Sequence, residues 1–162
     1  MYYAGYDSPV GTLLLECTES GLSGIYMDRE LPKQLDNHPV LQQTTLWLDA
    51  YFRGENLPVE IPLDPRGTVF QKQVWQILLT IPYGAIKTYG QIAREMALLQ
   101  GKEKMSAQAV GQAVGRNPIN ILVPCHRVVG KQGQLTGYGG GLPRKIWLLQ
   151  HEGHQIEKDF VL

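Results

Sequence analysis

A proline-rich stretch divides this sequence into two parts of opposite charge. Residues 56–67 contain three prolines and a glycine, which interrupt helices and strands and favour an exposed connection. Residues 1–65 hold three basic against ten acidic side chains, a net charge of −7, whereas residues 66–162 hold twelve basic against five acidic, a net charge of +7. We therefore predict two small domains, 1–65 and 66–162, and a polyanion as the partner of the second.

The composition excludes several classes of protein. Hydrophobic residues make up 43% and charged residues 19%, which is enough for packed cores and argues against disorder. No segment approaches the roughly 20 apolar residues of a membrane span, and the first residues do not form a secretory signal. Two cysteines, Cys17 and Cys125, are too few for a disulfide scaffold or a four-cysteine zinc site. We expect a cytoplasmic protein without a bound metal.

The first half has the pattern of a small sheet with one helix. Short β-prone runs at residues 2–6, 12–17 and 22–27 are separated by turn-forming residues, which predicts an antiparallel meander. From Val40 to Phe52 the apolar residues recur at helical spacing, and Gly54 follows them.

The second half begins with helical signals. Thr68–Gln71 and Thr88–Gln91 both have the pattern of a capping box at the start of a helix. Ser106 is placed to cap a third helix, built of small residues and ending near Val114. Two short helices joined by a turn in a basic region are typical of a helix-turn-helix, although an ordinary helical hairpin gives the same pattern.

Four further elements are predicted. Ile92, Met96 and Leu99 mark the buried face of the second of these helices. Residues 119–123 read as a short buried strand that ends at Pro124. Residues 128–136 read as a hairpin or a wing around a turn at 131–133, and a last helix begins at Pro143 and ends before Gly153.

The residues with the clearest chemistry are Val-Pro-Cys-His-Arg-Val at 123–128. Cationic groups and hydrogen-bond donors near a cysteine lower its pKa and raise the fraction of nucleophilic thiolate. His126 can accept the proton of Cys125 directly or through one water, and Glu152 can orient that histidine as a third member. Cys17 has no nearby base in the sequence and is predicted to be a core residue.

The chain resembles the O6-alkylguanine-DNA alkyltransferases over nearly its whole length. The resemblance is carried by motifs in the expected order: Ser8–Leu13, Phe70–Trp75, Ile81–Gly84, Tyr89–Ala93, Ala109–Gly111, Arg116–Pro118, Pro124–Val128, Gly137–Gly141 and Trp147–Gly153. It implies an α+β fold with a ribonuclease-H-like antiparallel-sheet domain over residues 1–65. It also implies a mostly helical, winged-helix-like DNA-binding domain over residues 66–162.

The resemblance implies repair of DNA by direct reversal. A methyl or other alkyl group on guanine O6 in double-stranded DNA would pass irreversibly to Cys125, so that each molecule acts once. His126 would be the base, through a water, with Glu152 polarising it. Asn117 would brace the cysteine turn, and Tyr89 would donate a proton toward guanine N3. No cofactor or metal is implied, and O4-alkylthymine as a second substrate is left open.

The resemblance also implies how the DNA is held. An enzyme that acts on a base must take it out of the stack. The extruded base would be bound by Val128, Tyr138, Gly139 and Gly140. The DNA would be contacted by Ser106, Gln108, Ala109, Gly111 and Arg116. Arg127 would tie the two halves together through a carboxylate, and we expect a monomer with no membrane partner.

Two features depart from the family pattern. Many relatives have an arginine where this chain has Gln108, and glutamine lacks the charge and planar group of a guanidinium. Base extrusion or DNA affinity is therefore expected to be weaker or differently specific. About five extra residues lie around 100–105, where Lys102 and Lys104 can contact phosphates.

Three other functions are compatible with parts of the pattern. A lesion sensor of the same fold would bind damaged DNA but lack the acceptor cysteine. A cysteine hydrolase would need an oxyanion hole and would turn over an ester or amide. A helix-turn-helix regulator would dimerise and bind a specific sequence. The presence of Cys125 together with His126, Asn117 and Glu152 favours alkyl transfer.

Overall fold

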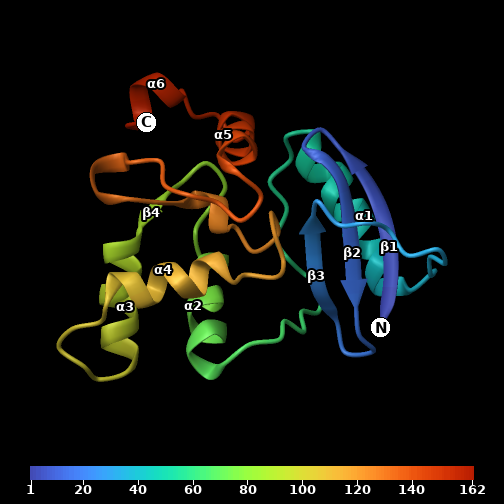
Figure 1. Ribbon diagram of the computed structural model, residues 1–162, viewed down its shortest axis with the longest axis horizontal. Coiled ribbons are helices and arrows are strands. Elements are labelled where there is room, and N and C mark those ends of the chain that lie inside the picture. Colours follow the sequence, from blue (N-terminus) through green and yellow to red (C-terminus); the bar gives the residue numbers. More distant parts are fainter. The chain divides into compact units, whose positions relative to one another are not determined.

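The computed structural model describes residues 1–162 and divides them into two compact units (Figure 1). The first, called the N-unit, comprises Met1–Arg66 together with Pro118–Leu122. The second, called the C-unit, comprises Gly67–Asn117 and Val123–Leu162. The first division of the chain thus lies at Arg66, one residue after the predicted boundary, and a short segment of the second half, Pro118–Leu122, also groups with the first unit.

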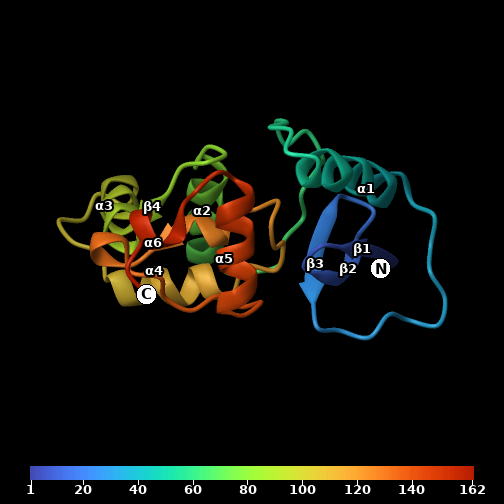
Figure 2. The ribbon, with the colours of Figure 1, turned by 90° about the horizontal axis from the view of Figure 1, so that it is seen from above.

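The N-unit contains the predicted antiparallel meander. Its strands are β1 (Tyr2–Ser8), β2 (Gly11–Cys17) and β3 (Leu22–Met27), in the order β1-β2-β3. The helix α1 (Pro39–Phe52) lies along one face of this sheet (Figure 2). Leu13 and Leu15 of β2 share a face because side chains alternate along a strand, and both are fully buried. Leu48 of α1 is also fully buried, and each such side chain contributes about 1.5–3 kcal/mol.

Two segments from elsewhere in the chain cover the outer edge of β3. Leu22 forms a parallel bridge with Leu63, and Ile25 forms one with Ile119. The amide of Ile25 donates to the carbonyl of Pro118 at 2.9 Å, and the side-chain amide of Asn120 donates to the carbonyl of Ile25 at 2.8 Å. Pairing these groups protects an edge that would otherwise be open to other strands.

The predicted strand at 119–123 is wrong. Only Ile119 pairs, and the chain then turns through Ile121, whose φ is 70°. A non-glycine residue with a positive φ is uncommon and locally strained. The side chain of Ile121 is fully buried in this conformation. An apolar run indicates burial, but here it belongs to a buried turn and not to a strand.

The C-unit is built mainly of helices, as predicted. They are α2 (Val69–Leu79), α3 (Tyr89–Leu99), α4 (Ala107–Gly115), α5 (Leu142–His151) and the short α6 (Ile156–Asp159), which the sequence did not indicate. Both capping boxes form, at Thr68 and Thr88, and the Ser106 hydroxyl accepts from the amide of Ala109. The indole of Trp75 donates to the carbonyl of Ala113 at 2.8 Å and joins α2 to α4.

Two predicted details of the C-unit are corrected. Leu99 is 66% exposed, and the buried face of α3 consists of Ile92, Ala93, Met96 and Ala97. The turn predicted at 131–133 forms, closed by the amide of Gly130 donating to the carbonyl of Gln134 at 2.7 Å, but the flanking residues do not pair as strands: β5 (Val128–Val129) pairs in parallel with β4 (Lys87–Thr88). After the 3-10 turn η2 (Lys131–Gly133), the amide of Leu135 donates to the carbonyl of Val161. No helix has the length and apolar character that crossing a membrane would require.

Candidate active site

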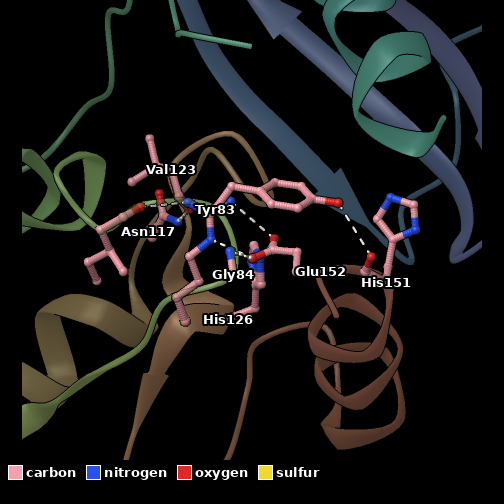
Figure 3. Close-up of polar contacts among 9 residues, drawn as sticks. Tyr83, Gly84, Asn117, Val123, His126, His151 and Glu152 are labelled. Atoms are coloured by element: carbon pink, nitrogen blue, oxygen red, sulfur yellow. Dashed lines mark hydrogen bonds and ion pairs between the residues drawn. The ribbon is translucent and has the colours of Figure 1, made fainter. Parts of the chain in front are cut away.

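Cys125 begins a one-turn 3-10 helix, η1 (Cys125–Arg127), directly before β5. The segment that precedes it leaves the C-unit after Asn117 and returns at Val123. The side-chain amide of Asn117 donates to the carbonyl of Val123 at 2.8 Å and closes this loop at its base (Figure 3). The amide of Cys125 donates to the same carbonyl, also at 2.8 Å. The position of the cysteine is therefore fixed from both sides of the loop.

The thiol of Cys125 lies in a buried environment. The residue is 6% exposed, and burial raises the pKa of the thiol above its ordinary value. A hydrogen bond from Asn117, the charge of Lys145 and the hydroxyl of Tyr138 act in the opposite direction without outweighing burial. This corrects the expectation that its surroundings give a lowered pKa. A base is needed to generate the thiolate.

A buried cluster around Glu152 adjoins the cysteine. Nε2 of His126 lies 2.6 Å from Oε2 of Glu152, and the Arg127 guanidinium donates to both carboxylate oxygens at 2.8 and 3.1 Å. The amide of Gly84 donates to Oε1 at 3.1 Å (Figure 3). Burial alone would raise the pKa of Glu152, but the hydrogen bonds from His126 and Arg127, together with the positive charge of Arg127, hold this pKa well below its usual range. Glu152 is therefore ionised.

The two ring nitrogens of His126 have different roles. Burial lowers the pKa of His126 below its ordinary value, so the ring is neutral at pH 7. A carboxylate can only accept hydrogen bonds, so the proton must be on Nε2, facing Glu152. Nδ1 is then the basic nitrogen, and it is buried with no hydrogen bond to any protein atom. A histidine held at one nitrogen and free at the other is arranged as a general base.

Arg127 has a different partner from the one expected of it. The carboxylate that it contacts is Glu152, which lies in the same unit, and its Nη1 donates to the carbonyl of Ile81 at 2.6 Å. It therefore joins the segment after α2 to the end of α5 within the C-unit. The expectation that this carboxylate contact ties the two halves together is corrected.

Two polar residues near the cysteine were not indicated by the sequence analysis. Lys145 on α5 is fully buried and donates to the carbonyls of Val128 at 2.6 Å and Thr136 at 3.4 Å. Burial lowers its pKa to about 8. The Thr136 hydroxyl lies 3.1 Å from that of Tyr89, the first residue of α3. Lys145 had a signal in the sequence, because it lies three and four residues before the apolar pair at 148–149 and thus on the buried face of its helix.

The predicted base-binding residues lie in two environments. Gly139 is exposed and Gly140 partly so, while the Tyr138 hydroxyl is buried beside Cys125. Val128 is fully buried; its amide donates to the carbonyl of Cys125, and its carbonyl accepts from Lys145. That carbonyl retains a second lone pair for a further donor.

The predicted DNA-contacting residues lie on and around α4. Ser106, Gln108 and Arg116 are exposed, and Ala109 and Gly111 are partly exposed. A shallow groove of about 630 Å³ runs between the start of α2 and this helix, lined in part by Thr68, Gln71, Ala109, Gln112 and Arg116. No three His, Cys, Asp or Glu side chains are grouped so that they could hold a metal ion.

Comparisons with known proteins cover almost the whole chain. Residues 1–65 match the ribonuclease-like domain of 6-O-methylguanine DNA methyltransferase, and residues 69–154 match its DNA binding domain. The methylated-DNA–protein-cysteine methyltransferase of Methanosarcina acetivorans is 45% identical over 94% of this chain and 99% of that protein. The protein of the same name from Mycobacterium leprae is 46% identical over 93% of this chain and 91% of that protein.

Solved structures show the same similarity. The crystal structure of Mycobacterium tuberculosis OGT in complex with DNA superposes with a TM-score of 0.81 at 43% identity, covering 94% of this chain and 92% of that chain. The structure of an O6-methylguanine DNA methyltransferase from Methanococcus jannaschii gives a TM-score of 0.68 at 27% identity, covering 94% and 95%.

Proposed function

The chain belongs to the 6-O-methylguanine DNA methyltransferase family, and on this basis we propose that it repairs DNA by moving an alkyl group from guanine O6 to its own Cys125. The observation that best supports this reaction is the state of His126. Its Nε2 is fixed on an ionised carboxylate while its Nδ1 remains available as a base next to the cysteine in the chain. The buried thiol needs such a base.

The proposed transfer balances without a cofactor. His126 takes the proton of Cys125 through a bridging water, and the sulfur attacks the alkyl carbon from the side opposite O6. The carbon–O6 bond breaks, and its electron pair passes to the guanine, which takes a proton from Tyr89 at N3 and leaves neutral. The proton held by His126 returns to the Tyr89 phenolate through solvent. Cysteine and O6-alkylguanine thus become S-alkylcysteine and guanine, and the thioether ends the protein's activity.

The C-unit supplies the features needed to bind DNA. Its residues include eleven basic and five acidic side chains, a net charge of +6, which attracts a phosphate backbone. We expect the exposed residues of α4 to enter a groove of double-stranded DNA while the damaged base turns out toward Cys125. The structural similarity to Mycobacterium tuberculosis OGT, which was solved in complex with DNA, supports this arrangement. Cys17 and Cys125 are both free thiols, which suits the reducing cytoplasm that we propose as its location.

The decisive experiment is mass spectrometry of the intact protein and its peptides after incubation with duplex DNA that contains O6-methylguanine. We expect one methyl group on Cys125, in a molar amount equal to the lesions lost. Cys125→Ser should gain no methyl group but retain DNA binding, and Cys17→Ser, which alters the other buried cysteine, should behave as the wild type does.

Each competing function gives a different outcome in this experiment. An unmodified protein that binds the lesion tightly would be a sensor, or a transferase limited by Gln108. Transfer regained in Gln108→Arg would identify the second case. Repeated turnover of an ester or amide substrate would instead identify a cysteine hydrolase.

A further inference from the structure

Thr136 is held in place at three of its groups. Its Oγ1 lies 3.1 Å from the hydroxyl oxygen of Tyr89. Its carbonyl accepts a hydrogen bond from the buried ammonium of Lys145 at 3.4 Å. Its methyl carbon lies against Gly130, only 3.1 Å from the point that a β-carbon on that glycine would occupy. Three separate contacts therefore restrain this half-buried loop residue, which indicates that its orientation matters.

The contact with Gly130 explains how the hydroxyl of Thr136 is aimed. The β-carbon of threonine carries both the methyl and the hydroxyl, so fixing one of them fixes the other. Gly130 has a φ of −75°, which any residue can adopt, so a side chain here is opposed by tight space and not by backbone conformation. A β-carbon at position 130 would lie 3.1 Å from the methyl carbon of Thr136 and 3.1 and 3.2 Å from the β-carbon and carbonyl oxygen of Gln134, so these atoms would have to shift by a few tenths of an ångström, and the Thr136 hydroxyl would shift with its methyl.

The Thr136 hydroxyl also affects how readily Tyr89 can lose a proton. Burial raises the pKa of Tyr89, and the hydrogen bond with Thr136 acts in the opposite direction. A hydroxyl that donates to the tyrosine oxygen stabilises negative charge there, and hydrogen bonds to charged groups are stronger than those to neutral ones. The hydrogen bond from Thr136 therefore stabilises the Tyr89 phenolate, formed when Tyr89 gives up its proton, more than it stabilises the neutral phenol.

We propose that Thr136 is a positioning residue for alkyl transfer, which orients the Tyr89 hydroxyl toward the departing base and donates a hydrogen bond to it as its proton leaves. This inference rests on the proposed function, in which Tyr89 protonates guanine N3. No proton is lost from Thr136 itself: its O–H bond stays intact while the Tyr89 O–H bond breaks and the N3–H bond forms. Lys145 and Gly130 act one step further away by holding Thr136.

The test compares Thr136→Val, which keeps the branched shape but removes the hydroxyl, with Thr136→Ser, which keeps the hydroxyl. Single-turnover transfer from an O6-methylguanine duplex is measured at saturating protein, and DNA affinity is measured separately by fluorescence anisotropy. We expect Thr136→Val to slow transfer about 5- to 10-fold, the loss of one hydrogen bond, with DNA affinity unchanged. Thr136→Ser keeps the hydroxyl but loses the methyl that holds it, so it should transfer faster than Thr136→Val and more slowly than the wild type.

A double-mutant cycle shows whether Thr136 acts through Tyr89. In a Tyr89→Phe background, Thr136→Val should cause no further loss, because the group that it serves is gone. Gly130→Ala should slow transfer in the wild-type background and likewise have no effect in Tyr89→Phe. Thermal melting of every variant separates loss of folding from loss of rate.

The outcomes for Thr136 and for the proposed function are distinct. If the wild type transfers the methyl group but Thr136→Val is as fast, or if the losses in Thr136→Val and Tyr89→Phe are additive, the inference is wrong while the proposed function stands. If the wild type does not transfer at all, the proposed function itself is wrong.

Discussion

Replacing Glu152 with glutamine should be among the most destabilising conservative changes in this chain. The Glu152 carboxylate is fully buried and accepts hydrogen bonds from His126, from two nitrogens of Arg127 and from the amide of Gly84. Glutamine has nearly the same shape but carries a donor where one oxygen was, so an N–H group would face another N–H group. The Arg127 guanidinium would also remain buried without an opposite charge.

The magnitude follows from that unpaired charge. Removing one partner of a buried ion pair costs about 3–5 kcal/mol, which is a large part of the 5–15 kcal/mol that stabilises a typical domain. For a chain of this length each kcal/mol corresponds to about 2–4 °C, so we expect Tm to fall by roughly 6–20 °C. Urea unfolding followed by tryptophan fluorescence gives the free energy, and circular dichroism gives Tm.

A surface ion pair in the same unit provides the matched control. Nζ of Lys87 lies 2.8 Å from Oε2 of Glu95, and the two side chains are 26% and 41% exposed. Glu95→Gln therefore makes the same chemical change at a carboxylate that is in contact with water. It should cost less than about 1 kcal/mol. Adding Arg127→Met to Glu152→Gln removes the unpaired charge, so the double variant should lose less stability than the two single losses combined. A Glu152→Gln protein as stable as Glu95→Gln, with strictly additive effects, would refute this account of the cluster.

Two further predictions concern the pH dependence of stability and the effect of a β-carbon at two glycines. The folded-state pKa values of His126 and Glu152 lie below their ordinary 6.5 and 4.5, so the unfolded chain binds these protons first as pH falls. The free energy of unfolding should therefore decrease below about pH 6.5 and decrease further below about pH 4.5, and urea titrations from pH 8 to 3 that show a flat profile would contradict this. In the N-unit, a β-carbon on Gly21 would lie 2.6 Å from the backbone oxygen of Pro62, which cannot rotate away, so Gly21→Ala should cost about 1–3 kcal/mol. Gly115→Ala, where nothing lies within 4 Å, should leave stability unchanged or slightly raised in the same urea titration.

Local signals predicted the elements of the fold well. The threonine–glutamine pairs at 68–71 and 88–91 formed capping boxes because such boxes depend only on residues within one helical turn. The meander formed where turn residues separated β-prone runs. The strand predicted from the apolar run at 119–123 is wrong, because hydrophobicity indicates burial without specifying backbone conformation. Ile121 adopts a positive φ that no local pattern requires.

The candidate site was only partly visible in the sequence. The Pro-Cys-His-Arg pattern indicated Cys125 and His126 and suggested Glu152 as a third member, and the structure places His126 Nε2 and Glu152 Oε2 2.6 Å apart although 26 residues separate them. The net direction of the Cys125 pKa could not be predicted, because it depends on burial that only the folded chain defines. Thr136 was missed for a similar reason: its importance comes from Tyr89, which lies 47 residues away in the sequence.

The order in which the chain leaves the ribosome matters for the N-unit. Synthesis of Met1–Arg66 supplies the whole sheet and α1, but the partner of Ile25 at the sheet edge is Pro118–Asn120, which is made about fifty residues later. Until then Leu22 is paired with Leu63, but Ile25 on the same edge remains unpaired and open to chaperones and to other chains. A fragment that ends at Arg66 would keep that part of the edge exposed permanently, and a fragment that begins at Gly67 would carry Ile119, Ile121 and Leu122 without the N-unit residues with which they group. Division of this protein at its proline-rich linker would therefore yield two pieces that are prone to aggregation.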